Sequence, residues 1–434
     1  MADDFETALK QAADNLAAAD AHAAFQAIHH HLRAPCSLDD ADLARGLDLL
    51  ARIAAAISGD RFAGLLTAVT DDLGDAQVLY NAAYEAIEEG LHGIAATLLE
   101  RANAAFPNQP SILAELCSAL EGEMLYERAA EHLQAADPAV FNDPVCAYLL
   151  AFNSLMSGRL EAAREAAARF EPAGDENLQF MKARLERALA RADAVHGATA
   201  LDDSDLRGWH FVLQGALLTH LSIAGYEDAM RGRYAWLQDS YVLCRQGLDH
   251  LKALLASVEF QPRRVVALGD RGSSVLATAA AELLGVPLHD WTADADGPEL
   301  VVAYDLGAAP PEQVQQLAVV RPGRLLFAHA CGWTEPLPFV ADVTTLLHQM
   351  NRAPWDGGLR MGDQGVEQTP PDDAPVAELA ARVLAAKYVE DNGAPFSELL
   401  KLAGSAWHAT AFAAGQDRRE RYFPGGPVKS NRFN

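Results

Sequence analysis

The chain has little cysteine, and none of it is spaced for a disulfide framework or a thiolate metal site. Only five of the 434 residues are cysteine, an odd number scattered between Cys36 and Cys331 without a CxxC pair. Secreted disulfide frameworks and zinc ribbons need even numbers or close spacings of cysteine. The scarcity therefore predicts reduced thiols and a cytoplasmic protein.

Basic residues and long apolar runs are also scarce. Lysine and arginine number 34 against 60 aspartates and glutamates, which gives a formal charge of −26. Nucleic acids and anionic membrane surfaces bind proteins through positive charge that displaces counterions. No uninterrupted apolar stretch is long enough to cross a bilayer, and the acidic first residues do not resemble a secretion signal. The composition thus argues against nucleic acid or a membrane as a partner.

One short segment is basic. Residues 416–434 hold five arginines and lysines against two acidic residues. The same segment is rich in glycine and proline and lies at the end of the chain, where residues are often loosely held. We expect a basic flexible tail that docks on an acidic surface, such as this acidic chain itself offers.

Two familiar phosphate-binding motifs are missing, and no metal site stands out. The sequence contains neither GxGxxG nor a glycine-rich loop ending in GKS or GKT. His29, His30 and His31 are adjacent, but consecutive residues on a helix point in different directions and cannot ligate one ion. Zinc binding by His329, Cys331 and an acidic residue has no better support. We therefore predict no metal site, and the sequence indicates no particular cofactor.

Residues 1–204 are rich in alanine and predict a helical array with an internal period. Units that begin at Ala76, Pro110 and Pro144 follow one another at 34 residues. Small side chains recur at two fixed positions of each unit, where they would let antiparallel helices approach closely. They are Ala83, Cys117 and Ala151 at the eighth position, and Ala95, Ala129 and Ala163 at the twentieth. The alternative is an alanine-rich helical array whose units are unrelated.

The period and the small positions resemble the tetratricopeptide repeat family. The resemblance covers about 100 residues, and the first unit closes with Ala102 and Pro107 as such repeats do. Helical hairpins at 39–72 and 176–194 extend the predicted array. The resemblance implies stacked hairpins with a groove that accepts a peptide or a helix of another protein. We expect this part to act in protein binding.

Residues 205–260 are predicted to form a helical junction. Leucine and aromatic residues recur at about every fourth position after Trp209 and again after Tyr234, which favours two long helices. Polar residues of these helices are candidates for a pocket between the array and the next domain, and the alternative is a polar interface between helices. They are His210, His220, Arg231, Arg233, Asp239 and His250.

Residues 261–415 predict a Rossmann-like α/β domain. Apolar runs at 265–268, 299–306 and 324–330 are typical of buried parallel strands, with helices predicted at 274–284 and 311–319. A further helix is predicted at 341–350, before a helix pair at 376–389 and 396–412. The predicted fold class is therefore multidomain: an all-α tetratricopeptide-like array, then a small α/β domain with a mostly parallel sheet and a C-terminal helix pair.

The turn after the first of these strands is a candidate ligand site. Its residues are Gly269, Asp270, Arg271, Gly272, Ser273 and Ser274. A helix begins within this turn, and the backbone N–H groups of a helix N-terminus attract an anion such as phosphate. The alternative is a structural turn in which Ser273 or Ser274 caps the helix.

This segment resembles type I phosphoribosyltransferases. In that family a strand leads into a pyrophosphate-contacting loop and an alanine-rich helix ending in LGVP, as at 284–287 here. The resemblance implies a phosphorylated sugar or nucleotide as ligand. Of the family's acidic pair only Asp305 is present, and the TGxT phosphate cradle that follows the pair is absent.

The ends of the later strands offer a second chemistry. Ligands of parallel sheets bind beyond the carboxyl ends of the strands. Cys331 is a candidate nucleophile there, with His329 as its base and Asp305 or Asp270 to orient the histidine. The alternative is that Cys331 is a small buried residue of the core.

Together these features predict a protein-interaction scaffold whose α/β domain binds a small ligand or is a vestigial enzyme. The alternative is an enzyme acting on a phosphorylated sugar or nucleotide. In that case the 269–274 turn would hold phosphate, and Asp305 would bind ribose or a metal.

Overall fold

The chain folds into two compact units, Met1–Leu185 and Glu186–Asn434. The computed structural model describes residues 2–57, 59–172, 174–222, 230–294, 297–334, 337–362, 365–388, 394–407 and 418–430. The division falls inside helix α11 (Glu176–Ala194), earlier in the chain than the predicted boundary at residue 204. The predicted junction therefore belongs to the second unit. No helix in the described ranges combines the length and apolar character needed to span a membrane.

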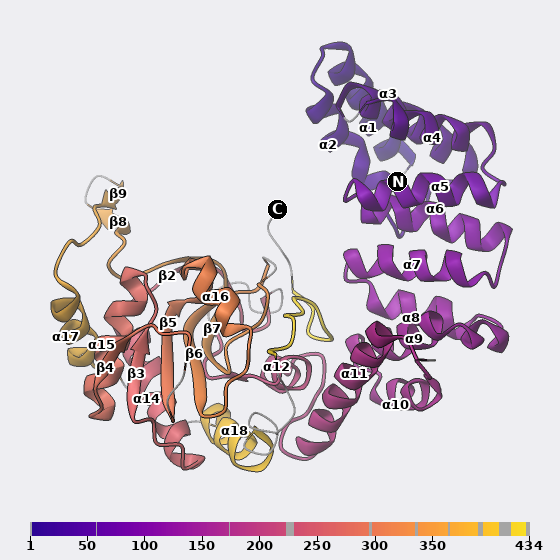
Figure 1. Cartoon of the computed structure of the whole chain (residues 1–434). Helices are drawn as coiled ribbons and strands as arrows, with labels where there is room; N and C mark the ends of the chain where they lie inside the picture. Colours follow the sequence, from indigo (N-terminus) through magenta and orange to yellow (C-terminus); the bar gives the residue numbers. More distant parts are fainter. Residues whose placement is uncertain are drawn as a thin grey trace. The chain divides into compact units, whose positions relative to one another are not determined.

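The first unit is a stack of helices that pack one on the next in chain order (Figure 1). Before α11 they are α1 (Ala2–Ala17), α2 (Ala21–Leu32), α3 (Asp40–Ile57), α4 (Asp60–Asp71), α5 (Ala76–Glu88), α6 (His92–Ala105), α7 (Pro110–Gly122), α8 (Tyr126–Gln134), α9 (Pro144–Met156) and α10 (Leu160–Arg169), with the 3₁₀ turn η1 (Pro138–Asn142) before α9. Leucine, isoleucine and alanine side chains between neighbouring helices form one continuous core. The predicted helical array is confirmed.

The predicted period appears in the backbone. Helices α5, α7 and α9 begin at residues 76, 110 and 144, and α6, α8 and α10 begin at 92, 126 and 160, so each pair starts 34 residues after the one before. The turn inside each pair has a left-handed residue at the same position, with φ of 76° at Gly90, 56° at Met124 and 79° at Gly158. Helix starts recur because Asp75 and Asp143 accept hydrogen bonds from the first free N–H groups of α5 and α9.

The small residues of the repeated pairs lie where the helices meet. All six side chains at the eighth and twentieth positions are completely buried: Ala83, Ala95, Cys117, Ala129, Ala151 and Ala163. In the middle pair the two positions touch, because the Cys117 thiol lies 4.0 Å from the carbonyl oxygen of Ala129. A larger side chain at either position would push α7 and α8 apart.

The second unit is built on a parallel sheet with helices on both faces (Figure 1). Its helices are α12 (Leu206–Gln214), α14 (Tyr241–Ser257), α15 (Arg271–Leu284), α16 (Pro311–Leu317), α17 (Val376–Ala385) and α18 (Ala394–Leu402), with the short turns η2 (Leu306–Ala308) and η3 (Ala403–Trp407). Its strands are β1 (Leu217–Leu218), β2 (Tyr234–Gln238), β3 (Arg264–Ala267), β4 (Leu288–Asp290), β5 (Glu299–Asp305), β6 (Arg324–Gly332), β7 (Val343–Arg352), β8 (Gly358–Gly362) and β9 (Gly365–Thr369).

Seven of these strands form the sheet, and β8 and β9 form a separate hairpin. The order is β1-β7-β6-β5-β3-β4, with β2 also on β7, and every pair in the sheet is parallel. After β4 the chain returns to the other side of β3 to form β5. The topological switch point, where ligands of such sheets bind, therefore lies between the carboxyl ends of β3 and β5. The predicted mostly parallel sheet is confirmed.

Each face of the sheet has its own helices. Helices α14 and α15 pack on one face, and α17 packs against both of them. On the other face a core of apolar residues runs from the strands to Leu317 of α16 and to Phe339. Alternate residues of a strand point to opposite faces, so neighbouring positions at the carboxyl edge enter different environments.

Two predicted helical segments are wrong. Residues 343–352 form the strand β7 instead of a helix, because Val343, Thr344 and Thr345 are β-branched and the strand pairs with β6, β1 and β2. The described residues of 206–255 form α12, β1, β2 and α14, so of the two predicted long helices only the second is present, and it begins later, at Tyr241. Gly215 ends α12 with a left-handed φ of 68°, and the next residues join the sheet beside β7.

The described residues of the predicted tail, 418–430, pack against the second unit. Arg419 donates its backbone N–H to Ala318 (2.8 Å) and forms an ion pair with Asp342. Glu420 is buried and pairs with Arg187 at 2.6 Å and Arg191 at 2.8 Å. These ion pairs, together with the buried side chains of Tyr422 and Val428, hold residues 418–430 on the second unit. Residues 416–417 and 431–434 lie outside the described residues.

Candidate functional site

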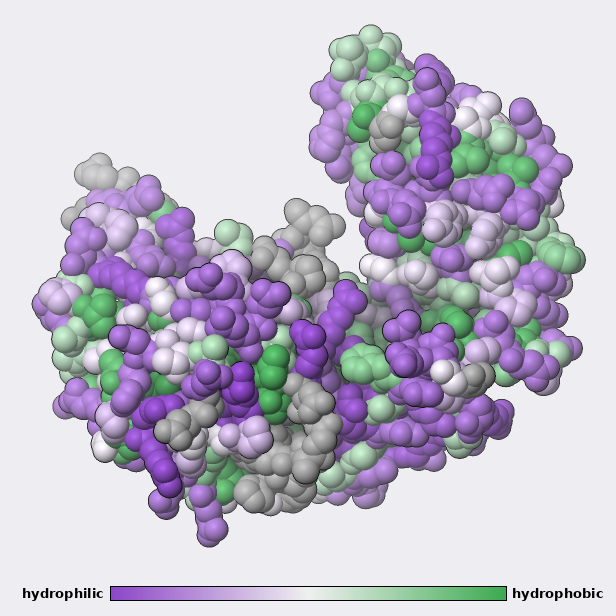
Figure 2. All heavy atoms as spheres, in the orientation of Figure 1, coloured by the Kyte–Doolittle hydropathy of each residue, from purple (hydrophilic) through white to green (hydrophobic). Residues whose placement is uncertain are grey.

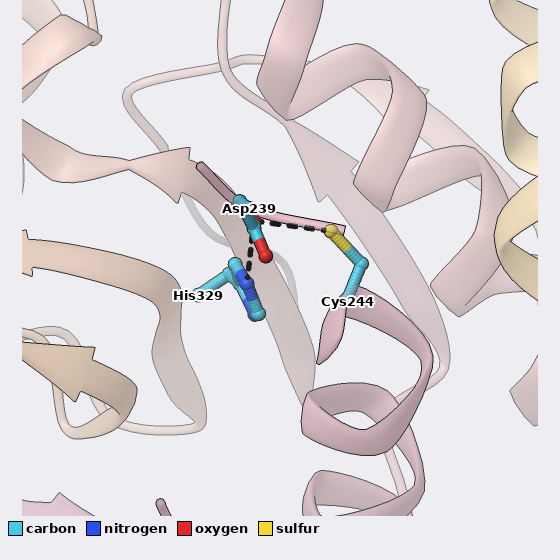
Figure 3. Close-up of side chains that lie close together, drawn as sticks. All are labelled: Asp239, Cys244 and His329. Atoms are coloured by element: carbon cyan, nitrogen blue, oxygen red, sulfur yellow. Dashed lines mark hydrogen bonds and ion pairs between the residues drawn. The ribbon is translucent and has the colours of Figure 1, made fainter. Parts of the chain in front are cut away.

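A buried carboxylate, Asp239, connects four elements near the carboxyl edge of the sheet; Figure 3 shows its contacts with His329 and Cys244. It follows β2 and accepts hydrogen bonds from Tyr304 Oη of β5 at 2.7 Å and from His329 Nε2 of β6 at 3.0 Å. The thiol of Cys244 in α14 lies 3.4 Å from the same oxygen, and the Ser240 N–H donates to the other at 2.6 Å. One side chain thus joins strands that are distant in sequence.

The network holds an ionised carboxylate inside the unit. Burial alone would raise the pKa of Asp239, but the His329 imidazole and the hydrogen bonds from His329, Tyr304 and Ser240 outweigh it and lower that pKa. Burial and the charge of Asp239 raise the pKa values of Tyr304 and Cys244. Tyr304 and Cys244 therefore keep their protons and donate to an ionised carboxylate.

These side chains are closed to solvent. The exposed fraction of both the Asp239 and His329 side chains is 0%. Gly247 of α14 packs so closely on His329 that an added Cβ would lie 2.9 Å from its Nδ1 atom. The Asp239 network accordingly holds strands and helices together.

The donor set of Asp239, Cys244 and His329 is one that zinc accepts, and the three ligand atoms lie within 4.8 Å of one another. The same atoms are, however, at ordinary hydrogen-bond distances. A metal-bound imidazole usually donates its second N–H to an acceptor, whereas His329 Nδ1 has no partner among the described residues. The geometry therefore fits a hydrogen-bond network better than a metal site.

The three predicted catalytic candidates do not come together. His329 pairs with Asp239 rather than with Asp305 or Asp270. The thiol of Cys331 is completely buried beside the carbonyl oxygen of Gly332, 3.8 Å away, and burial followed by the charge of Asp305 raises its pKa. A nucleophilic cysteine needs the opposite, an accessible thiol with a lowered pKa. The structure places Cys331 as a core residue.

Asp305 meets a histidine that the sequence did not point to. Its carboxylate lies 2.9 Å from His348 Nε2 of β7, and Asp305 Oδ1 accepts the Gly307 N–H at 3.0 Å. The pair reaches across β6, where the intervening positions are Ala330 and Gly332. The Asp305 side chain is 16% exposed, so solvent reaches this pair at the carboxyl edge beside the switch point.

The 269–274 turn lies at the carboxyl end of β3 as predicted, and most of its polar groups bind within the chain, although Asp270 Oδ2 has no partner among the described residues. Asp270 caps α15 by accepting the Ser273 N–H at 2.7 Å, and Ser274 donates to the Asp270 carbonyl. Ser273 Oγ accepts the Tyr304 N–H. Arg271 donates to the carbonyl oxygens of residues 372 and 374. A carboxylate therefore stands at the helix end where phosphate was expected, and binding of phosphate here stays a prediction.

The polar residues predicted for the junction divide between two places. His220 Nε2 contacts Tyr234 Oη at 2.8 Å, in the electrostatic neighbourhood of His250, His329 and Asp239. His210 instead lies beside Arg233 in a cavity closed by residues 422–428. Tyr304 and His348 were missed. A signal for them was strand alternation, which puts Tyr304 and His329 on one face and Asp305 and His348 on the other.

In the helical array, one surface is open. Helices α5 and α7 are neighbours, and together they present Tyr80, Tyr84, Glu88, Glu115, Ser118 and Glu121, all exposed or half-buried; we call this set the α5–α7 face. Beside it, α4 and α5 enclose a hollow of about 590 Å³ lined by Arg61, Gly64, Leu65, Tyr80, Asn81, Tyr84 and Glu85. Figure 2 shows mostly hydrophilic surface with scattered hydrophobic residues on the side in view.

Comparison with known proteins adds no family. No family model matches the chain, and a search of curated proteins finds no significant match.

Proposed function

We propose that the protein is an interaction scaffold whose tetratricopeptide-like helical array binds a segment of another protein along the α5–α7 face. The observation that carries the proposal is the hollow of about 590 Å³ beside this face, bordered by Tyr80 and Tyr84. Tyr84 is 46% exposed, although tyrosine at a helix surface usually packs against a neighbour. Tyrosine is enriched in protein interfaces, since it supplies a large contact area with a polar end.

The repeated architecture supports this surface as the binding site. Neighbouring pairs that start 34 residues apart present equivalent positions side by side, so α5 and α7 form one continuous strip. Stacked helical pairs commonly bind an extended peptide or a helix along such a strip.

For the α/β unit we propose a small-ligand site at the Asp305–His348 pair, with no catalytic role. Asp305 is partly exposed and lies next to the switch point, where ligands of parallel sheets bind. The closed Asp239 network behind it holds β2, β5, β6 and α14 in register. Rigid support of this kind is what a binding edge needs.

Site-specific photo-crosslinking tests the scaffold proposal. A photoreactive amino acid replaces Ser118 on α7, and a control variant carries it at Glu165, exposed on α10. The expected result is one discrete crosslinked protein from cells for Ser118 and none for Glu165, with the product lost when the Ser118 variant also carries Tyr84→Ala. Equal crosslinking at both positions, or no product at Ser118, would contradict the proposal.

Ligand-dependent unfolding tests the α/β proposal. A ligand that binds only the native state raises its stability by mass action. All six tryptophans lie between Trp209 and Trp407, so tryptophan fluorescence follows the second unit alone. We expect one member of a nucleotide and sugar-phosphate series to raise the midpoint in the native chain and not in Asp305→Ala. Arg271→Ala is a poor probe, since Arg271 holds residues 372–374. A series without any shift would leave the pair a structural contact.

A further inference from the structure

The α5–α7 face carries acidic side chains that no described basic residue pairs with. Glu88, Glu115 and Glu121 form no ion pair with a described residue. Several other carboxylates in the same unit are paired with arginine. Glu85 binds Arg61, Glu100 binds Arg128, and Glu123 binds Arg33.

Among the described residues, no positive group shifts the pKa of Glu115 or Glu121. Burial and then the charge of Glu88 raise the pKa of Glu115. Burial raises the pKa of Glu121 to about 7, although Asn153 Nδ2 donates a hydrogen bond to it at 2.7 Å. Asn153 is completely buried, and its Oδ1 atom has no partner among the described residues. A carboxyl group and an amide oxygen thus stand together with unused capacity to accept hydrogen bonds.

Aromatic rings lie next to these acids. Burial, followed by the charges of Glu115 and Tyr84, raises the pKa of Tyr80, which makes Tyr80 and Glu115 electrostatic neighbours across α5 and α7. A guanidinium or ammonium group is attracted both to the face of a tyrosine ring and to a carboxylate. An acidic peptide would meet repulsion on the same surface, and a purely apolar one would leave the carboxylates without partners.

We propose that the α5–α7 face recognises a basic segment of a protein partner, whose arginine or lysine side chains pair with Glu115 and Glu121. This inference rests on the proposed scaffold function and specifies the chemistry of the partner.

The proposal has a proton-linked consequence. Near pH 7 a large fraction of Glu121 holds its proton, since the pKa of its carboxyl group is about 7. A cation bound beside it favours the ionised carboxylate, and the proton passes to the buffer. Binding of a basic segment should therefore release protons, and binding of a neutral one should not.

Fluorescence anisotropy of the full chain with three labelled peptides tests the proposal. The peptides have equal length and apolar content and differ only in whether their polar positions are arginine and lysine, serine and glutamine, or glutamate. The binding variant is Glu115→Gln with Glu121→Gln. The matched control is Glu161→Gln with Glu165→Gln, which removes the same charge from exposed positions of α10. Titration calorimetry in buffers of different ionisation enthalpy counts the protons released.

The expected result is binding of the basic peptide alone, weakened about tenfold or more in the binding variant and unchanged in the control. Affinity should fall as salt is raised, and proton release should vanish in the binding variant. Suppose instead that the neutral or acidic peptide binds as well as the basic one, and that Tyr84→Ala weakens this binding. That result would overturn the inference and leave the scaffold function standing. If no peptide binds, the inference is overturned, and failure of the Ser118 crosslink would then overturn the scaffold function as well.

Discussion

Asp239 and His329 are separated by 90 residues in the chain, yet Asp239 Oδ2 and His329 Nε2 lie 3.0 Å apart with both side chains completely buried. The contact closes the carboxyl ends of β2 and β6 against α14. An ionised group in such a place is stable only while its hydrogen-bond donors remain.

Asp239→Asn should destabilise the second unit by about 2–4 kcal/mol, because the amide cannot accept hydrogen bonds from Tyr304, His329 and Cys244 as a carboxylate does. Urea unfolding followed by tryptophan fluorescence measures the change. Asp294→Asn is the control, since the Asp294 side chain is 95% exposed and its removal should cost about 0.5 kcal/mol or less. Equal stability of both variants would contradict a central role for the network.

Gly247→Ala should cost about 1–3 kcal/mol in the same assay. The added methyl group would lie 2.6 Å from Thr345 Oγ1 and 2.9 Å from His329 Nδ1, and neither neighbour can move without disturbing the sheet. Gly404→Ala is the matched control, as its added Cβ would meet no atom within 4 Å. If Gly247→Ala left the urea midpoint unchanged, the packing of α14 on β6 would be looser than described.

The second unit should lose stability as the pH falls below 6.5. Burial, together with the charges of Arg233 beside His210 and of His250 and His329 beside His220, lowers the pKa of His210 to about 3 and that of His220 to about 4, from 6.5. The unfolded chain takes up these protons first, so each histidine removes about 1.4 kcal/mol per pH unit between 6.5 and its native pKa. Tryptophan-detected urea unfolding at several pH values measures the slope. His220→Gln should reduce it, and exposed His289→Gln should not.

The first unit should respond to pH in the opposite sense. The pKa of Glu121 is raised by burial from 4.5 to about 7, so the unfolded chain loses this proton before the native state does. Stability from this group is full below pH 4.5 and is lost as the pH rises to 7. Far-UV circular dichroism follows this mostly helical unit, which holds no tryptophan. Glu121→Gln should flatten the dependence of stability on pH. If the dependence did not change, the Glu121 carboxyl group would be hydrated rather than buried.

Ala95→Trp and Ala129→Trp should each destabilise the array by about 1–3 kcal/mol, since both positions are completely buried where two helices meet. Ala104→Trp is the control, at an exposed position of the same helix as Ala95. Circular dichroism during thermal unfolding compares the three. If Ala104→Trp were as destabilising as the other two substitutions, the loss of stability would not come from overpacking where the two helices cross.

The sequence was enough to predict the array and much of the sheet. The 34-residue spacing of small residues is a local signal, because each helix pair packs through the same positions. The apolar runs of β3, β5 and β6 were likewise recognisable as buried parallel strands, and the glycine-containing turn before α15 fell where it was predicted.

By contrast, β7 was mistaken for a helix, β1 and β2 were hidden in a helical pattern, and the packed residues 418–430 were taken as mobile. Each of these segments is held by partners far along the chain. The same holds for the candidate site, where Asp305 was named from the sequence but His348 was not. The periodicity of the sequence was therefore enough to predict the helices and strands that pack against elements close to them in the chain. Only the tertiary structure decided the sheet edge and the side chains it brings together, because strand pairing depends on contacts that no local pattern records.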